Sequence, residues 1–193
     1  MTAQPTLLLA SSSPRRREIL NALGLEFSVQ VNDVDETPLP GESPEQLVSR
    51  LAEAKSRAAV CGPEDYVIGA DTAVVLDDEV LGKPVDQSDA IGMLLRLSGR
   101  SHRVLTAVAL RGPDGVRTVL SSTRVSFREI SRDEALAYWQ SGEPRDKAGA
   151  YGIQGLGGLF VSGIDGSYSG VVGLPVFETA GLLREAGFEL LRK

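Results

Sequence analysis

Three consecutive arginines, Arg15 to Arg17, follow a run of serines and a proline, directly after the apolar residues 6–10. This order predicts a strand, a turn of small residues and a helix that begins at Pro14, because proline suits the first helical position. Ser13 can cap this helix, and the free N–H groups and positive end of a helix attract anions. The densest basic cluster of a chain with net charge −6 therefore indicates a phosphate-binding site.

A solvated helix face is the alternative interpretation of the arginine triplet, because runs of charge commonly face water. However, arginine beside the positive end of a helix costs about a few tenths of a kcal/mol unless an anion offsets it. This electrostatic argument favours the anion site.

A single carboxylate, Asp71, interrupts the apolar run 66–76, which reads as a buried strand. A buried carboxylate is costly without a partner or a task, and ligands of α/β sheets bind beyond strand ends, where Asp71 and Thr72 are expected. The alternative is a structural aspartate that starts a turn or pairs with a lysine; Lys83 could reach back to it. Glu36 and Asp71 together would suit a hard cation such as Mg²⁺ or Mn²⁺.

Other catalytic routes find little support. His102 is the only histidine, so a Ser-His-Asp triad would depend on it, and no Gly-x-Ser-x-Gly motif occurs. A structural, hydrogen-bonding role is the favoured interpretation of His102. The single cysteine, Cys61, excludes an intramolecular disulfide and a multi-cysteine zinc site.

The residues that could do chemistry must be positioned by alternating strands and helices, since 193 residues with 42% hydrophobic content suffice for one core or two lobes sharing a sheet. The pattern predicts a mixed α/β protein with hairpins as well as crossovers. Strands are expected at 6–10, 27–31, 66–76, 104–110 and 116–127, and helices at 14–23, from Ser43, at 87–97, from Ser131 to about 141, and from Pro175 to about 186. The glycine-rich segment 149–173 is expected to form strands and close turns.

The acidic balance, with a pI of about 4.9, argues against broad binding to nucleic acid or to an anionic membrane. No secretory leader pattern and no run of roughly 20 apolar residues occurs. We therefore expect a cytoplasmic protein with a small anionic ligand and without nucleic-acid or membrane partners.

Several motifs, in order along the chain, carry a resemblance to a known family. They are Ser-x-Ser-x-Arg-Arg at 11–16, Gly-Ala-Asp-Thr at 69–72, Gly-Lys-Pro at 82–84, Ser-Gly-x-x-His at 98–102, Asp-Lys-Ala-Gly-Ala-Tyr-Gly-Ile-Gln-Gly at 146–155 and Gly-Leu-Pro at 173–175. From the first strand to the last helix the chain closely resembles the Maf family of nucleoside triphosphate pyrophosphatases.

The resemblance implies a metal-dependent hydrolase, with Mg²⁺ or Mn²⁺, that cuts nucleoside triphosphates between the α- and β-phosphates. It implies a single domain over residues 1–193, of the α/β class, with two lobes around an elongated mixed β-sheet and flanking helices, similar to inosine triphosphate pyrophosphatases. The site would lie in the cleft between the lobes, and the protein would be a homodimer.

Carried over position by position, the resemblance makes Asp71 the general base and, with Glu36, a metal-site carboxylate. The positions that match phosphate-holding residues are Ser11, Arg16, Lys55 and Lys83. The positions that separate subfamilies are Arg15, Thr72 and Gln154, and this combination resembles the branch that acts on dTTP and UTP, with CTP and modified pyrimidine nucleotides as further candidates. The alternative branch, acting on methylated GTP, typically has Trp at the position of Arg15 and Gln at that of Thr72.

A rival function is a non-catalytic nucleotide-sensing regulator, since the family is linked to septum formation and to arrest of cell division. A sensor would need the arginines and Lys83 but not Asp71 and Glu36, so the carboxylates favour an enzyme. For such an enzyme, the resemblance leaves cleansing of the nucleotide pool and control of cell division as alternative roles. A phosphomonoesterase is disfavoured because no phosphatase nucleophile motif occurs.

Overall fold

The computed structural model describes residues 6–191, so both ends of the expected domain 1–193 lie outside the described residues. The strands are β1 Leu7–Leu9, β2 Ser28–Val29, β3 Tyr66–Leu76, β4 Glu79–Leu81, β5 Ser101–Gly112, β6 Gly115–Phe127 and β7 Val161–Asp165. The helices are α1 Pro14–Ala22, α2 Pro44–Ala58, α3 Gln87–Leu97, α4 Arg132–Gln140, α5 Tyr168–Val172 and α6 Val176–Glu185. Three short 3₁₀ helices, η1 Glu143–Asp146, η2 Ala148–Ala150 and η3 Leu156–Phe160, connect α4 to β7.

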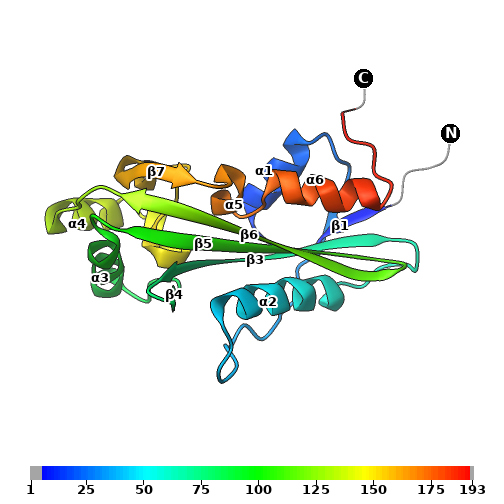
Figure 1. Ribbon diagram of the computed structural model, residues 1–193, viewed down its shortest axis with the longest axis horizontal. Helices are drawn as coiled ribbons and strands as arrows, with labels where there is room; N and C mark the ends of the chain where they lie inside the picture. Colours follow the sequence, from blue (N-terminus) through cyan, green and yellow to red (C-terminus); the bar gives the residue numbers. More distant parts are fainter. Residues whose placement is uncertain (1–5, 192–193) are drawn as a thin grey trace.

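The strands form one mixed sheet with the order β2-β1-β3-β5-β6-β7, and β4 also pairs with β3. β1 is parallel to β2 and β3, whereas the other pairings are antiparallel. The long strands β3, β5 and β6 extend along the molecule in Figure 1 and connect its two ends. This arrangement confirms the predicted α/β class and the elongated mixed sheet.

One edge of β3 is left open in the middle of the sheet, and Asp71 and Thr72 lie there, within the strand and not at a strand end as expected. β1 pairs with this edge as far as Ile68, and β4 pairs with it from Val74 onward. Along the opposite edge, β5 pairs with β3 from Val67 to Val75. Among the described residues, no strand covers the first edge between residues 69 and 73, which include Asp71 and Thr72.

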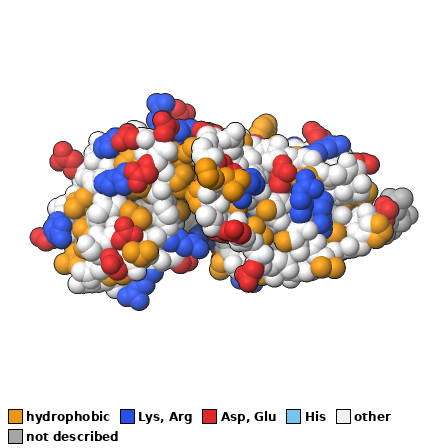
Figure 2. Space-filling model, turned by 90° about the horizontal axis from the view of Figure 1, so that it is seen from below, with side chains coloured by type: hydrophobic (Ala, Val, Ile, Leu, Met, Phe, Trp, Pro, Cys, Tyr) orange, Lys and Arg blue, Asp and Glu red, His pale blue; other side chains and the backbone are white. Residues whose placement is uncertain are grey.

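The helices cover the sheet differently at its two ends. α2 lies on one face, α1, α5 and α6 lie on the other face, and α3 and α4 pack at the far end (Figure 1). Separate apolar clusters fill the two ends: one includes Leu94, Leu97 and Phe127, and another includes Leu20 and Leu183. The molecule therefore has two lobes that share a sheet, and Figure 2 shows it narrowing between them, with charged side chains at the narrow part.

The predicted helix starts are confirmed at atomic detail. Ser43 and Ser131 each begin a reciprocal capping box, with Gln46 and Glu134 as the third helical residues. The side chain of Ser13 accepts a hydrogen bond from the backbone N–H of Arg16, as expected of a cap. Within residues 6–191, no helix combines the length and the apolar composition of a membrane span.

The glycine-rich segment 149–173 differs from the prediction of strands and close turns. It contains β7, but also 3₁₀ helices and the short helix α5. α5 begins where the Ser167 side chain accepts a hydrogen bond from the Gly170 N–H, and it ends at Gly173, whose φ of 127° favours glycine. A helix of this length has too few turns to show an apolar period, so local caps decide its formation.

Candidate active site

A close approach between α2 and β3 positions Lys55 over Asp71. A side chain at Gly69 would collide with the backbone of Ala52 and Ser56 on α2, so glycine at this position allows the helix to lie directly against the strand. Gly69 and Asp71 point to the same face, since side chains alternate along a strand. Lys55, on the same helix, therefore reaches the carboxylate.

Lys55 joins the two carboxylates that the sequence singled out. Its Nζ lies 2.6 Å from Oδ1 of Asp71 and 2.6 Å from Oε1 of Glu36. The side chains of Lys55 and Asp71 are only 17% and 14% exposed, so this ion pair is largely shielded from water. The alternative that Asp71 pairs with a lysine is thus correct in part, but the lysine is Lys55 and not Lys83.

The two carboxylates have opposite tendencies to hold a proton. Burial raises the pKa of Asp71, and the charge and hydrogen bond of Lys55 oppose this shift without cancelling it. Burial is also the largest influence on Glu36 and acts to raise its pKa, but the hydrogen bond and charge of Lys55, with the charges of Lys83 and Arg16, outweigh it and lower the pKa. The site thus makes Asp71 more basic than an ordinary aspartate and Glu36 less basic than an ordinary glutamate.

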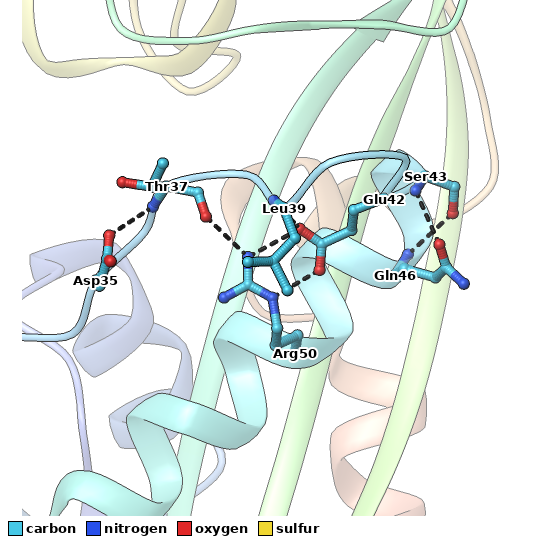
Figure 3. Close-up of polar contacts among 7 residues, drawn as sticks. All are labelled: Asp35, Thr37, Leu39, Glu42, Ser43, Gln46 and Arg50. Carbon is cyan, nitrogen blue, oxygen red and sulfur yellow. Dashed lines mark hydrogen bonds and ion pairs between the residues drawn. The ribbon is translucent and has the colours of Figure 1, made fainter.

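The loop that carries Glu36 is tied to α2 by Arg50 (Figure 3). The Arg50 guanidinium binds both carboxylate oxygens of Glu42, at 2.6 and 2.8 Å, and its Nη2 also donates to the Thr37 carbonyl at 3.1 Å. The Glu42 carboxylate in turn accepts a hydrogen bond from the Leu39 N–H. These contacts fix the chain on the C-terminal side of Glu36, and α2 thus positions both Lys55 and this carboxylate.

Arg16 approaches the open edge of β3 from α1 and is held by three acceptors. Its Nε donates to the Gly173 carbonyl at 2.8 Å, its Nη1 to Ser11 Oγ at 3.1 Å and its Nη2 to Thr72 Oγ1 at 3.2 Å. Burial lowers the pKa of Arg16, against the opposing charge of Asp71. Because a guanidinium has five N–H donors, two remain for an anion.

A chain of hydroxyl groups fixes the direction of the hydrogen bonds behind Arg16. Thr72 Oγ1 lies 3.0 Å from Oγ1 of its strand neighbour Thr106, which donates to the Gly170 carbonyl at 2.8 Å. Since Thr106 uses its proton on Gly170, Thr72 donates to Thr106 and accepts from Arg16. The Thr72 hydroxyl thus has its donor occupied and orients the guanidinium.

Among the described residues, no hydrogen bond or ion pair joins the remaining predicted site residues to these groups. Lys83 is exposed after β4, and its charge lowers the pKa of Glu36. Arg15 is half-buried on α1, and its charge contributes to lowering the pKa of Asp146, behind the larger effect of the Lys147 hydrogen bond. Gln154 is exposed, on the segment between η2 and η3.

Direct contacts thus join six of the predicted residues in two groups of three, one around Arg16 and one around Lys55, and the charges of Arg16 and Asp71 influence each other across them. Arg17 is exposed on α1. Successive helical residues face different directions, so the three neighbouring arginines of α1 do not share the contacts of Arg16. The contacting residues are Ser11, Arg16, Glu36, Lys55, Asp71 and Thr72.

Sequence reasoning missed the backbone and hydroxyl groups that support Arg16. Gly173 belongs to the Gly-Leu-Pro motif, so its importance was signalled but not its role as an acceptor. The nearby segment 167–171 carried no site prediction, yet Gly170 anchors Thr106 there. Thr106 could not have been singled out, since a lone threonine in a strand carries no distinctive signal.

The donors present fit a hard divalent cation of the predicted kind. Carboxylate oxygens of Glu36 and Asp71 both lie within hydrogen-bonding distance of one atom, Nζ of Lys55, so both reach one small region. Among residues 6–191, no group of three or more Asp, Glu, His or Cys side chains is placed to hold a metal. Such a cation would therefore bind these two carboxylates and complete its shell with water and phosphate oxygens, which is typical of Mg²⁺.

Comparison with known proteins shows the family of this chain. The family model described as Maf-like protein matches residues 6–186. A protein of Hahella chejuensis named dTTP/UTP pyrophosphatase is 52% identical over 188 residues, which cover 95% of this chain and 94% of that protein. A Pseudoalteromonas translucida protein of the same name is 54% identical over 178 residues, covering 91% and 94%.

A solved structure of a HAM1 protein from Coxiella burnetii has a similar fold, with a TM-score of 0.53 and 16% sequence identity. The match covers 94% of this chain and 100% of that one, so the likeness extends to both lobes and confirms the expected fold. The family match and the high identity to these relatives over almost the whole length confirm the resemblance read from the motifs: this chain belongs to the Maf family.

Proposed function

We propose that this protein hydrolyses dTTP and UTP to the nucleoside monophosphate and pyrophosphate, using a divalent cation. The observation that carries the proposal is the ion pair of Lys55 with the largely buried Asp71 at the open edge of β3, next to Thr72, which holds Arg16 in a fixed orientation. The relatives named dTTP/UTP pyrophosphatase, at 52% and 54% identity, support this substrate class.

The triphosphate would bind through cationic groups on two sides of the open β3 edge. Arg16 offers its two unused N–H groups in a fixed orientation, and a guanidinium matches phosphate oxygens in pairs. Lys83 is exposed and free to move toward a ligand from the β4 side. Neutralising phosphate charge while fixing the reacting atoms is the main requirement of this chemistry.

In the proposed reaction, a water oxygen attacks the α-phosphorus and the bond from the α-phosphorus to the bridging oxygen breaks. Asp71 accepts a proton from the water, and pyrophosphate leaves with the bridging oxygen. Burial raises the pKa of Asp71, which makes its carboxylate a better base, whereas the charge and hydrogen bond of Lys55 favour its ionised form. Both effects follow from the burial of Asp71 beside Lys55.

Glu36 and Asp71 are the residues that would hold Mg²⁺ or Mn²⁺. When bound, the cation supplies positive charge to the phosphate oxygens. Without the cation, Lys55 holds both carboxylates together. The site is therefore organised before the cation and the substrate bind. The pair Arg50–Glu42 supports this arrangement by fixing the Glu36 loop.

Base preference would depend on Arg15, Thr72 and Gln154. An amide can donate and accept at once, so Gln154 is suited to reading the edge of a pyrimidine. Thr72 would act through Arg16, since its hydroxyl is committed to Arg16 and Thr106. The methylated-GTP branch typically has glutamine at position 72, and this longer side chain would displace the hydrogen bonds of Thr72 with Arg16 and Thr106. The presence of Thr72 therefore favours the pyrimidine branch.

Hydrolysis in ¹⁸O-labelled water tests the proposed bond cleavage. Attack at the α-phosphorus places the label in the monophosphate, and mass spectrometry of the separated products locates it. Label in pyrophosphate alone would contradict attack at the α-phosphorus. Binding of dTTP without any turnover, with either metal, would favour the nucleotide sensor instead.

The remaining expectations follow from family membership. We propose a cytoplasmic homodimer whose hydrolysis cleanses the nucleotide pool, with the link to septum formation arising from that hydrolysis. Light scattering on the purified protein tests the dimer: a mass of one chain, 20.5 kDa, would contradict it.

A further inference from the structure

The segment that carries Gln154 is held by two side chains from a different part of the chain. Glu143, the first residue of η1, accepts hydrogen bonds at Oε2 from the Leu156 N–H, at 2.8 Å, and at Oε1 from the Gly157 N–H, at 3.1 Å. Tyr138, on α4, donates its hydroxyl to the same carboxylate at 2.7 Å and accepts the Gly152 N–H at 3.0 Å. Backbone groups on both sides of Gln154 are therefore fixed.

Glycines in this segment make the close approach possible. A side chain at Gly155 would collide with the Glu143 carboxylate, and one at Gly157 would collide with the Tyr138 hydroxyl. Gly155 has a φ of −112°, outside the left-handed region that favours glycine, and its lack of a side chain makes room for the Glu143 carboxylate. The two glycines thus allow Glu143 and Tyr138 to form their hydrogen bonds with the backbone around Gln154.

The Glu143 carboxylate that accepts these hydrogen bonds is ionised. Burial acts to raise the pKa of Glu143, but the hydrogen bonds from Tyr138, Gly157 and Leu156 outweigh it and lower the pKa. Lys147 adds to the anchor, because its Nζ donates to the Glu143 carbonyl at 2.9 Å. Hydrogen bonds to a charged acceptor are stronger than neutral ones, so the segment is held firmly.

We propose that Glu143 and Tyr138 are positioning residues for base selection, which act by fixing the backbone that presents Gln154. This inference rests on the proposed function, in which Gln154 reads the base. An exposed amide side chain selects a base only when its backbone is fixed, because a mobile one adapts to any base and loses entropy on binding. The preference for pyrimidines would then depend on residues that never touch the nucleotide.

Two variants, called the release variants below, weaken the hydrogen bonds of Glu143 in different ways. Glu143→Gln replaces one acceptor oxygen with an NH₂ group, which would face a donor, and Gly155→Ala pushes the carboxylate away. The matched controls are Glu134→Gln, which alters a carboxylate bonded to Ser131 and Arg128 in the same lobe, and Gly163→Ala, since a side chain at Gly163 would meet no atom within 4 Å. Thermal unfolding verifies that each variant is folded.

Hydrogen exchange and nucleotide binding are then measured on the full chain. We expect faster exchange of the Leu156 and Gly157 amides in both release variants and unchanged exchange there in both controls. Calorimetry with non-hydrolysable α,β-methylene analogues of dTTP and dGTP gives the base preference without any turnover. We expect the preference for the dTTP analogue to fall about tenfold, the amount that one charged hydrogen bond contributes.

A double-mutant cycle separates positioning from general stabilisation. If Glu143 acts through Gln154, then Glu143→Gln changes the preference little in a Gln154→Ala background. Equal losses in both backgrounds, or an unchanged preference in folded Glu143→Gln with faster amide exchange, would overturn the inference. Because binding is measured without hydrolysis, lack of turnover by the wild type would contradict only the proposed function.

Discussion

Lys55 Nζ lies 2.6 Å from Oδ1 of Asp71, in a place where both side chains are more than four-fifths buried. The same nitrogen binds Glu36 at 2.6 Å, so one cation serves two carboxylates. Burial raises the pKa of Asp71, and Lys55 is the largest opposing influence. The lysine therefore controls how basic the proposed catalytic carboxylate is.

Replacing Lys55 is expected to move the acid limb of the activity profile. Lys55→Met removes the charge that favours ionised Asp71, so the pKa of Asp71 rises further and the limb shifts to higher pH. The measurement is the pH dependence of the residual kcat/KM, with Lys55→Arg as the control that retains a positive charge. An acid limb at the wild-type pH in Lys55→Met would show that the pair does not set this titration.

Thr72→Val is expected to weaken substrate binding by releasing Arg16. The variant keeps the shape of threonine but removes the acceptor of the Arg16 Nη2 hydrogen bond, so KM should rise about tenfold, the amount that a hydrogen bond to a charged group contributes. Thr72→Ser keeps the hydroxyl and should retain most of the affinity. Equal KM values for the valine and serine variants would contradict an orienting role of the hydroxyl.

The Arg50–Glu42 pair is expected to control the Glu36 loop. The hydrogen bonds from Arg50, followed by that from Leu39, lower the pKa of Glu42 to about 2, so the contact persists well into the acid range. Because the folded-state pKa is depressed, the stabilisation is complete above the usual value of 4.5 and is lost as pH falls toward 2. Glu42→Gln should weaken the contact at neutral pH.

The measurements for Glu42→Gln are hydrogen exchange at the Leu39 amide and the metal concentration needed for half-maximal activity. The exchange rate and the required metal concentration should both increase, because the loop that carries Glu36 becomes mobile. Glu185→Gln, which removes a remote surface pair with Arg117, is the matched control and should change neither. Faster exchange at Leu39 with an unchanged metal requirement would argue against Glu36 as a metal ligand.

His102 is expected to make the fold sensitive to acid. Its ring is buried, its Nε2 lies 2.8 Å from the Tyr151 hydroxyl, and burial lowers its pKa from 6.5 to about 4. Between these values the unfolded chain binds a proton that the folded chain does not, so stability falls as pH is lowered through this range. Complete protonation would cost roughly 3 kcal/mol.

Chemical unfolding between pH 7.5 and 4 measures this loss of stability. His102→Gln keeps a polar group near Tyr151 but cannot titrate, so its stability should fall less steeply with pH than that of the wild type. Parallel pH dependences of the two proteins would show that His102 is not the responsible group. The buried position agrees with the structural interpretation of His102 and offers no triad.

The strong local signals of the sequence predicted most of the fold. Ser43 and Ser131 cap helices as expected, and the apolar run that Asp71 interrupts forms a single strand. The open edge of β3 could not be predicted, because it depends on where two different strands, β1 and β4, stop and start their pairing. Strand neighbours are set by tertiary packing, which a single sequence does not display.

The site was predicted as a set of residues but not as an arrangement. The motifs indicated Arg16 and Asp71, and the family resemblance added Lys55, whereas the sharing of Lys55 between two carboxylates depends on the approach of α2 at Gly69. Supporting contacts through backbone carbonyls, such as that of Gly173, carry little side-chain signal. The role of Thr72 illustrates this difference, since its partners come from α1 and β5.

The central claim is that Asp71 is the base of a pyrophosphohydrolase, and product analysis with Asp71→Asn tests it most directly. Purified wild type and variant are incubated with Mg²⁺ or Mn²⁺ and a panel of nucleoside triphosphates, and the products are separated by ion-exchange chromatography. We expect monophosphate and pyrophosphate, formed fastest from dTTP and UTP, and a rate at least about a hundredfold lower in the variant, typical of losing a general base, with nucleotide binding largely retained. Undiminished turnover by pure Asp71→Asn, or release of inorganic phosphate in place of pyrophosphate, would contradict the account.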